Sequence, residues 1–433
     1  MKRVAFHTLG CKVNQYETQA MTELFEGSGY HLVKDTEIAD VYVINTCTVT
    51  NVGDKKSRQF IRRAKRNNPD GIIVVVGCYA QTAPEKVLDI EGVNIVIGTN
   101  ERNKIVEIVE GCSADSKVNV VDDIMKIKKF EEMTVQEMHG KTRAFLKIQE
   151  GCNQYCAYCI IPYARGPIRS RGKIEIIQEV QTLVNNGFKE VVLTGIHVAS
   201  YGKDLGDHEG LLDVLKRVNA IEGLERIRLS SLEPTLFSDA FLSALSKLEK
   251  ICDHFHLSLQ SGSDKTLKKM NRKYTSQMYR ETVKRIRHYY PLVALTTDII
   301  VGFPGETDVD FQTSYDFVEE MAFSEIHVFK YSPREGTPAA QFDDQIDGIT
   351  KHERSEKLIE LGDRLKKEYQ LQFIDQRMEV LLEGQSGQDQ NLLEGFTTNH
   401  LKVLLASKQG KEGMLQDVQI DKIMDSGLLG HLL

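Results

Sequence analysis

Three cysteines within one short loop form the motif of this chain that most strongly indicates chemistry. Cys152, Cys156 and Cys159 are separated by three and then two residues, so a single loop can wrap one metal centre. Thiolates are soft ligands that select iron–sulfur clusters, zinc or copper(I). A structural zinc site needs four ligands, usually from paired arms, and the nearby sequence offers no second arm. The spacing therefore favours a 4Fe–4S cluster with one open iron, and zinc is the alternative.

The loop and the residues after it resemble the signature of radical S-adenosylmethionine (SAM) enzymes and, within that superfamily, the methylthiotransferases. Tyr158 precedes the last cysteine, and the resemblance continues through Pro162, Tyr163, Arg165-Gly166 and Arg169-Ser170-Arg171. It implies that the open iron binds the amino and carboxylate groups of SAM. It also implies that the reduced cluster cleaves SAM to methionine and a 5′-deoxyadenosyl radical, which abstracts an otherwise unreactive hydrogen.

A second set of three cysteines follows three predicted strands near the N-terminus. Short runs rich in valine and isoleucine alternate there with helical patterns, which predicts a parallel, doubly wound α/β sheet. The strands and their following cysteines are residues 4–9 with Cys11, 41–46 with Cys47, and 72–77 with Cys78. Because parallel strands present their carboxyl ends on one edge, these cysteines should converge and hold a second cluster. The alternative is three separate buried cysteines that behave as small hydrophobic residues.

This second set also resembles the methylthiotransferases, whose N-terminal domain holds an auxiliary 4Fe–4S cluster with three cysteines. Cys11, Cys47 and Cys78 occupy the corresponding places, and the run from Leu9-Gly10-Cys11 to Tyr16-Glu17 is close to that of the family. The resemblance implies that residues 1–115 form the N-terminal methylthiotransferase domain. We interpret Cys112 as a bystander thiol and Cys252 as a core or loop residue.

Length and composition indicate an ordinary globular protein of two or three domains. The chain has 433 residues, a net charge of −7 and 8 cysteines, too few for a disulfide scaffold of this length. The longest strongly apolar run, residues 72–77, is far too short to span a bilayer. The N-terminus enters a strand-like run rather than a signal peptide. We therefore expect a cytoplasmic protein.

Residues 138–369 are predicted to form a radical SAM core domain. A polar segment over residues 113–137 indicates a linker, with room for one extended stretch. A strand near 143–148 leads into the Cys152 loop, and further strand-like runs follow at 191–195, 226–231, 256–260, 296–301 and 325–331. About six strand–helix units suit the partial (β/α)6 barrel of the superfamily, in which the chemistry lies at the carboxyl ends of the strands.

Polar and glycine-rich motifs lie where these strands end, and the resemblance implies that they contact SAM. The candidate contacts are Tyr158, Thr194, Gly195, Ser231, Glu233, Gln260, Ser261, Asp298, Gly302 and Glu306. Glycines let the backbone approach a cofactor closely, and the Glu306 carboxylate can accept a hydrogen bond from a hydroxyl. The run from Gly302 to Glu306 has the alternative of being only a turn.

The chain contains three groups of basic residues although its net charge is negative. Residues 55–66 carry seven basic residues and no acid, a pattern typical of a solvated helix face or of an RNA-binding one. The other groups follow the cluster loop and the fourth strand of the core domain. They are Arg165, Arg169, Arg171 and Lys173, and Lys265, Lys268, Lys269, Arg272 and Lys273. Either group is expected to be a solvated surface or to contact phosphates.

Residues 370–433 are predicted to form a small β-barrel. The charged stretch 351–370 is helical, with Leu358, Leu361 and Leu365 on one face, and it leads into alternating apolar and polar runs with glycine-rich turns. This segment resembles the TRAM domain, an RNA-binding β-barrel of the tRNA-modifying methylthiotransferases. It lacks a basic cluster and has few aromatic residues for stacking on bases.

The resemblance implies an enzyme that converts a C–H bond into C–SCH₃ with two molecules of SAM and two 4Fe–4S clusters. The run Lys12-Val13-Asn14-Gln15-Tyr16-Glu17 is most similar to the branch that acts on N6-threonylcarbamoyladenosine beside the tRNA anticodon. The alternatives are isopentenyladenosine in tRNA and an aspartate of a ribosomal protein. We expect tRNA and a reducing donor such as flavodoxin or ferredoxin as partners, and the sequence singles out no acid–base residue. Two rival classes are a protein-modifying radical SAM enzyme and a non-catalytic zinc or cluster protein that binds RNA.

Overall fold

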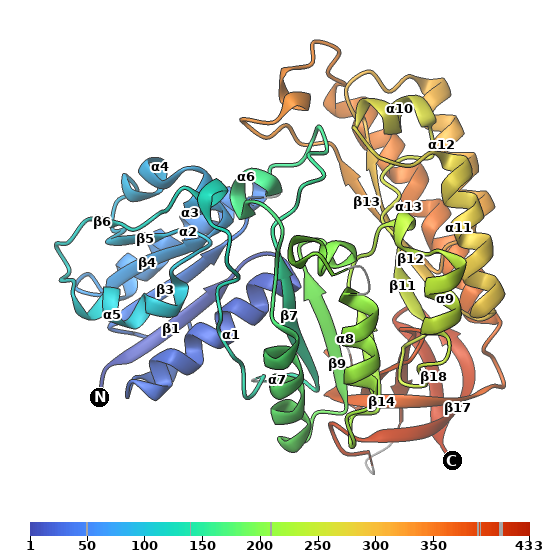
Figure 1. Ribbon diagram of the computed structural model, residues 1–433, viewed down its shortest axis with the longest axis horizontal. Helices are drawn as coiled ribbons and strands as arrows, with labels where there is room; N and C mark the ends of the chain where they lie inside the picture. The colour runs from blue at the N-terminus through green and yellow to red at the C-terminus, as the bar shows by residue number, and fades with distance from the viewer. Residues whose placement is uncertain (49–50, 139, 208–209, 388, 390, 407–409) are drawn as a thin grey trace.

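The computed structural model of the chain has three parts that follow one another in sequence (Figure 1). It describes residues 1–433 except 49–50, 139, 208–209, 388, 390 and 407–409, and of residues 51–55 it describes only the helical backbone. An N-terminal α/β unit is followed by a second α/β domain and a C-terminal β-barrel, so the predicted α/β architecture with a terminal barrel is confirmed. None of the helices in this described part has the length and apolar character needed to cross a bilayer.

The N-terminal sheet is parallel throughout, and its strands lie in the order β2-β1-β3-β4-β5-β6. Valine and isoleucine side chains of the central strands are buried on both faces because helices cover both sides. The strands are β1 (Arg3–Thr8), β2 (His31–Val33), β3 (Val41–Thr46), β4 (Ile72–Gly77), β5 (Ile95–Ile97) and β6 (Val118–Asn119). The helices are α1 (Lys12–Gly27), α2 (Asn51–Asn67), α3 (Cys78–Thr82), α4 (Pro84–Leu88) and α5 (Ile105–Glu110). Sequence analysis did not predict β2 and β5, which are too short to show a pattern.

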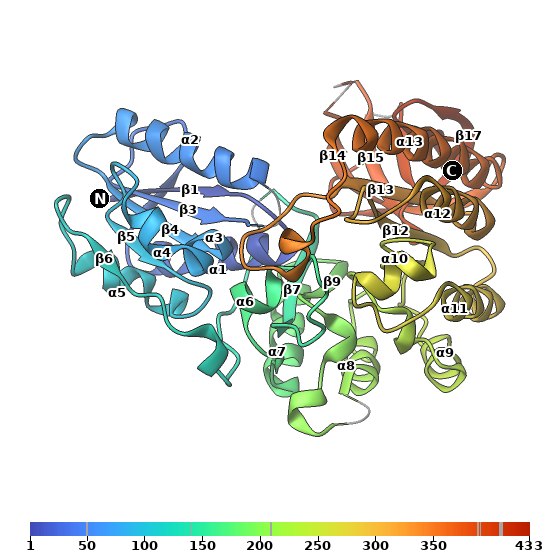
Figure 2. The same ribbon diagram turned by 90° about the horizontal axis from the view of Figure 1, so that it is seen from above.

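The central domain is an open barrel of parallel strands, apart from the short antiparallel β8, with helices on its outside (Figures 1 and 2). Its sheets, β10-β9-β7-β8 and β11-β12-β13, are joined by single bridges from Ile227 to Ile251 and from Leu232 to Leu257. The strands are β7 (Arg143–Glu150), β8 (Arg169–Ser170), β9 (Glu190–Gly195), β10 (Arg226–Leu229), β11 (His254–His256), β12 (Ala294–Val301) and β13 (Glu325–Lys330). The helices are α6 (Ile161–Arg165), α7 (Lys173–Asn185), α8 (Gly210–Asn219), α9 (Asp239–Leu245), α10 (Asp264–Lys269), α11 (Ser276–Tyr289), α12 (Asp308–Met321) and α13 (Gly348–Leu371).

The predicted strand over residues 256–260 is wrong in its extent. Strand β11 ends at His256, and beyond it the chain meets its neighbours only at single bridges. The Tyr274 hydroxyl donates to the carbonyl oxygens of Ser258 and Leu259 at 2.7 and 2.8 Å and so replaces strand partners. Gln260 has φ +69°, a left-handed conformation that ends any regular strand.

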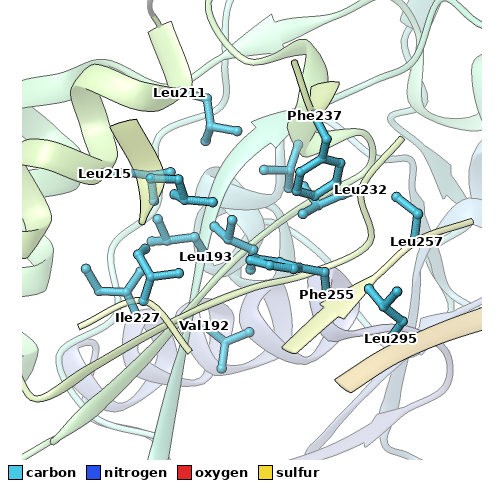
Figure 3. Close-up of a cluster of buried hydrophobic side chains, with 14 of the residues drawn as sticks. Val192, Leu193, Leu211, Leu215, Ile227, Leu232, Phe237, Phe255, Leu257 and Leu295 are labelled. Atoms are coloured by element: carbon cyan, nitrogen blue, oxygen red, sulfur yellow. The ribbon is translucent and has the colours of Figure 1, made fainter. Parts of the chain in front are cut away.

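The main core lies between the strands of the central domain and its outer helices (Figure 3). Figure 3 shows Phe255 among Leu193, Leu232 and Leu257, and its ring centroid lies 5.3 Å from that of Phe237. Phe255 is fully buried. A large aromatic side chain in such a place contributes strongly to stability because no solvent can replace its contacts.

The C-terminal segment forms a closed barrel with the strand order β14-β15-β16-β18-β17, which confirms the predicted small β-barrel. Its strands are β14 (Arg377–Gln385), β15 (Leu393–Thr397), β16 (Lys402–Leu405), β17 (Leu415–Met424) and β18 (Gly427–Leu432). The barrel covers the starting ends of the central strands (Figure 1). Arg226 and Arg228 of β10 donate to the carbonyl oxygens of Phe396 and Thr398, each at 2.9 Å.

Replacing Phe255 with alanine should lower the free energy of unfolding by about 3–5 kcal/mol, because a cavity forms in a close-packed core. Urea titration followed by circular dichroism measures this change. The control is Leu292→Ala, whose side chain is 56% exposed and which should change stability by less than about 0.5 kcal/mol. Equal effects of the two substitutions would contradict the placement of Phe255.

Candidate active site

The first three cysteines lie at one edge of the N-terminal sheet, each directly after one of three adjacent strands. Cys11 follows β1, Cys47 follows β3 and Cys78 begins α3 after β4. Gly10 and Gly77 have φ of +113° and +95°, which only glycine adopts without strain. A Cβ atom on Gly10 would lie 2.9 Å from Cβ of Cys47, so a glycine is required for this close approach. The backbone is therefore shaped to bring the cysteines together.

The N-terminal triad is graded in exposure, with Cys78 buried, Cys47 half-buried and Cys11 exposed. Burial raises the pKa of the Cys78 thiol to about 12, Arg165 acts to lower it, and Cys47 and Cys11 act to raise it. The three sulfurs are thus close enough to influence one another. A free thiolate would be costly in such a place, and a metal or cluster offsets that cost.

The second triad lies in the loop after β7, where backbone hydrogen bonds fix its shape. The N–H of Cys152 donates to Gly166 at 3.0 Å, and the N–H of Cys159 donates to Cys156 at 2.9 Å. Burial raises the pKa of Cys152 to about 11 and of Cys159 to about 12, and Cys156 acts to raise both. All eight cysteines are free thiols. Both triads therefore offer sulfur donors only, a set that fits 4Fe–4S clusters.

A buried network of ion pairs joins the N-terminal triad to the second. Arg165, in the helix after the Cys159 loop, donates from Nε to Sγ of Cys78 at 3.1 Å. The same guanidinium pairs with Glu17 at 2.5 Å and Glu150 at 3.1 Å. Lys147, Arg102 and Glu131 complete the network, with Lys147 3.1 Å from both Glu17 and Glu150, and Arg102 2.5 Å from Glu17 and 2.6 Å from Glu131. The network spans the N-terminal unit, the linker and the central domain.

A second arginine serves the cluster loop of the central domain in the same way. Arg272 donates from Nη1 to Sγ of Cys156 at 3.2 Å and from Nη2 to Glu233 at 2.6 Å. Burial acts to raise the pKa of Glu233, but His197 and Arg272 outweigh it and hold the pKa below its ordinary value. Glu233 is therefore an ionised partner that orients Arg272 toward the sulfur.

A cavity of about 240 Å³ lies beside the cluster loop. Its lining includes Cys159, Tyr158 and three residues that lie on or after neighbouring strands, Gln260, Asp298 and Phe329. Arg334 also lines it and donates from Nη2 to Oγ1 of Thr48 at 2.6 Å. Since Thr48 follows Cys47 in the sequence, Arg334 links the lining of the cavity to the segment after the N-terminal triad. The cavity itself lies beside the cluster loop and is placed to receive a cofactor or a substrate.

The structure brings only some of the candidate SAM contacts around this cavity. Tyr158, Gln260 and Asp298 line it, Thr194 and Gly195 end β9, and Glu233 lies beside the cluster loop. Ser231 is exposed at the end of the neighbouring strand.

The remaining candidate contacts are engaged in local structure. The Ser261 hydroxyl bonds with that of Ser314 at 2.9 Å. Glu306 accepts from the N–H of Gly302 at 3.0 Å and from Arg354 at 2.7 Å. These contacts support the turn interpretation of the run from Gly302 to Glu306.

The basic group after the cluster loop is not a surface, contrary to both sequence interpretations. Arg165, Arg169 and Arg171 are at most 2% exposed. Arg171 pairs with Glu179 at 2.6 Å, and Lys173 pairs with Asp213 at 2.6 Å. In the group after the fourth strand, Arg272 is likewise buried and faces Cys156. Sequence analysis treated these arginines as basic residues but gave no sign of their acidic partners, which lie between 8 and 148 residues away with no local pattern to connect them.

Comparison with known proteins connects this geometry to a family. Residues 3–98 match the uncharacterized protein family UPF0004, and residues 146–318 match the radical SAM superfamily. The chain is 46% identical to the threonylcarbamoyladenosine tRNA methylthiotransferase MtaB of Bacillus subtilis, over 99% of this chain and 95% of that protein. The chain belongs to the radical SAM methylthiotransferase family.

Other relatives of this methylthiotransferase are named for two different tRNA nucleosides. The MtaB of Aquifex aeolicus is 42% identical over 85% of this chain and 89% of its own length. The tRNA-2-methylthio-N(6)-dimethylallyladenosine synthase of Clostridium novyi is 37% identical over 100% of this chain and 97% of its own length. The cofactors of the family are SAM and 4Fe–4S clusters.

Solved structures support the fold of the methylthiotransferase. The radical SAM methyltransferase TsrM of Kitasatospora setae, with cobalamin and a [4Fe-4S] cluster bound, gives a TM-score of 0.59 at 16% identity. The match covers 78% of this chain and 77% of that one. The cobalamin-dependent radical enzyme OxsB gives a TM-score of 0.52 at 12% identity, over 82% of this chain and 56% of that one.

Replacing Glu17 with glutamine should destabilise the methylthiotransferase by about 3–5 kcal/mol at neutral pH, because buried cations lose their partner. Burial acts to raise the pKa of Glu17, but Arg102, Arg165 and Lys147 outweigh it and hold the pKa well below the ordinary value of 4.5. The contribution of Glu17 is therefore present above pH 4.5 and is lost as pH falls through the lowered pKa.

Thermal or urea unfolding of the wild type and the Glu17→Gln variant, measured at pH 7 and at acidic pH, checks this prediction. The control is Glu335→Gln, which breaks the exposed pair with Lys86 and should leave stability nearly unchanged, because solvent screens exposed ion pairs. A wild-type level of stability for Glu17→Gln at pH 7 would contradict the role given to the network.

Proposed function

We propose that this chain converts N6-threonylcarbamoyladenosine, next to the anticodon of tRNA, into 2-methylthio-N6-threonylcarbamoyladenosine. The observation that carries the proposal is the pair of cysteine triads linked by Arg165, which follows the second triad and donates to Cys78 of the first, together with a cavity beside the second triad. Two relatives named for threonylcarbamoyladenosine are 46% and 42% identical to this chain, and a relative named for dimethylallyladenosine is 37% identical. This order favours threonylcarbamoyladenosine over isopentenyladenosine and over a ribosomal-protein aspartate.

Each triad has a separate task in this proposal. Cys152, Cys156 and Cys159 hold the cluster that binds SAM, and Cys11, Cys47 and Cys78 hold the auxiliary cluster. When bound, the cofactors supply the radical that activates the substrate carbon and the methylated sulfur that replaces its hydrogen. The protein orients both groups across the cavity, with Tyr158, Gln260 and Asp298 toward the SAM side and Arg334 toward the auxiliary side. The burial of Cys78 and Cys156 limits the access of water to the reactive groups.

Two partners and a location complete the proposal. The substrate is tRNA, and the electron comes from a low-potential donor such as flavodoxin or ferredoxin. A tRNA-modifying enzyme of this kind works in the cytoplasm, where its substrate and its reductant occur together. Assay of tRNA methylthiolation with each reduced donor distinguishes the donors.

Anaerobic iron and sulfide analysis should give about eight irons for the wild type and about four for a Cys152→Ala, Cys156→Ala, Cys159→Ala variant, because each triad holds one cluster. A Cys11→Ala, Cys47→Ala, Cys78→Ala variant should also keep about four. Nucleoside analysis of tRNA from cells with each variant should show N6-threonylcarbamoyladenosine without its 2-methylthio form.

The matched control is a Cys112→Ala, Cys252→Ala variant, which should keep all the iron and the modification. If the wild type contained about four irons and the variant without Cys152, Cys156 and Cys159 contained none, only one cluster would be present. Cys11, Cys47 and Cys78 would then be packing residues. If the purified protein contained zinc and no iron, it would be interpreted as a non-catalytic RNA-binding protein rather than as an enzyme.

We propose that helix α2 contacts the tRNA backbone. Lys56, Arg62 and Arg66 are exposed on this helix, while the side chain of Lys55 lies outside the described residues. Arg63 is less available because it pairs with Asp35 at 2.8 Å and lies over the ring of Phe60. The helix begins shortly after Cys47, so a nucleic acid bound along it would pass near the auxiliary site.

Charge reversal at Arg62 and Arg66 should weaken tRNA binding and reduce the slope of log affinity against log salt by about two, one for each lost phosphate contact. Fluorescence anisotropy with an anticodon stem-loop at several salt concentrations measures both. The control is Lys247→Glu with Lys284→Glu, two exposed lysines of the central domain. An unchanged slope with Arg62→Glu and Arg66→Glu would remove α2 from the RNA site.

A further inference from the structure

The hydrogen bond between Arg165 and Cys78 places a cation of the central domain on a sulfur of the N-terminal unit. We propose that Arg165 sets the reduction potential of the auxiliary cluster by stabilising its reduced form. The inference rests on the proposed function, since Cys78 must be a cluster ligand. Arg165 is a positioning residue in this scheme, because it acts on the cluster through the sulfur of Cys78.

The guanidinium of Arg165 is held in one orientation. Its Nε donates to Sγ of Cys78 at 3.1 Å, and its Nη2 donates to Oδ1 of Asn14 at 2.7 Å. Glu17 and Glu150 accept from the remaining side of the fork. The side chain of Arg165 is fully buried. With these acceptors arranged around it, the guanidinium cannot turn away from the sulfur without losing a buried ion pair.

The surrounding charges make the sulfur sensitive to this one contact. The network contains the cations Arg102, Arg165 and Lys147 and the anions Glu17, Glu131 and Glu150, so its formal charges cancel. Removing the charge of Arg165 would leave one negative charge in excess beside Cys78. Water is excluded there, so that excess would be weakly screened. Hydrogen bonds to sulfur and net charge are the quantities that tune cluster potentials.

Arg165 belongs to the central domain, so its contact with Cys78 links that domain to the N-terminal unit. Arg165 ends α6, directly after the loop that carries Cys159, and α6 lies beside α3, which begins with Cys78 (Figure 1). The central domain therefore supplies a donor to the auxiliary site. Its own cluster loop has a separate donor, Arg272 on Cys156 at 3.2 Å. In the described contacts each triad thus has a buried arginine on one of its sulfurs, and of these two arginines it is Arg165 that reaches across the domain boundary.

The test isolates the auxiliary cluster in the full chain. In a Cys152→Ala, Cys156→Ala, Cys159→Ala background, Arg165→Lys keeps the charge without the Nε–H donor, and Arg165→Gln keeps an N–H donor without the charge. Each variant is titrated anaerobically with dithionite, which delivers one electron to the cluster, and the reduced form is counted by electron paramagnetic resonance. Both substitutions should make reduction at least tenfold less favourable, a fall in midpoint potential of about 59 mV for one electron.

The matched control is Glu131→Gln, a member of the same network that pairs with Arg102 and touches neither Arg165 nor a cysteine in the described contacts. It should keep its iron and shift the potential by less than either Arg165 variant, and not downward. About four irons with an unchanged potential in the Arg165 variants would overturn the inference and leave the proposed function standing. Loss of iron in both Arg165 variants, but not in Glu131→Gln, would make Arg165 purely structural. If the Cys152→Ala, Cys156→Ala, Cys159→Ala variant with Arg165 intact contained no iron, Cys11, Cys47 and Cys78 would not be cluster ligands and the proposed function would fail.

Discussion

The buried pairing of Arg165 with Glu17 is the constraint on which the arrangement of the two cysteine triads depends. Glu17 lies on α1 after Cys11, and Arg165 lies on α6 after Cys159, so one ion pair fixes the helices that follow the two sites. Charged groups are rarely buried, because desolvation costs several kcal/mol per ion unless partners are complete. Lys147, Arg102, Glu150 and Glu131 complete them here. The network therefore specifies one relative position of the two domains.

Topology explains why the cysteine triads could be predicted from the sequence and the network could not. Cys11, Cys47 and Cys78 each follow a strand, and the parallel sheet places those positions side by side. The partners of Arg165 are separated from it by 148 residues for Glu17 and 15 for Glu150, with no local pattern to connect them. A sequence shows the charge of an arginine but not the carboxylate that lets it be buried.

Local hydrogen bonding explains where the predicted strands were wrong. The run from His256 to Gln260 has the apolar alternation of a strand, but Tyr274 takes two of its carbonyl oxygens and Gln260 turns into a left-handed conformation. The turn brings Gln260 to the cavity beside Cys159 and Asp298. Departures from regular structure at a strand end are typical of sites, because they aim backbone and side chains at a ligand. The left-handed conformation of Gln260, which ends the alternating pattern of the predicted strand, therefore also forms part of the cavity lining.

Polar residues at the starting ends of the central strands give the C-terminal barrel a role in the fold. Arg143, Arg226 and Arg228 begin β7 and β10, where a barrel closed on itself would place apolar layers. Arg228 pairs with Glu190 at 2.7 Å and also donates to Thr397 and Thr398 of the C-terminal barrel. The open central barrel thus leaves donors that the C-terminal barrel helps to satisfy. This contact covers the end of the central barrel that lies away from the cluster loop.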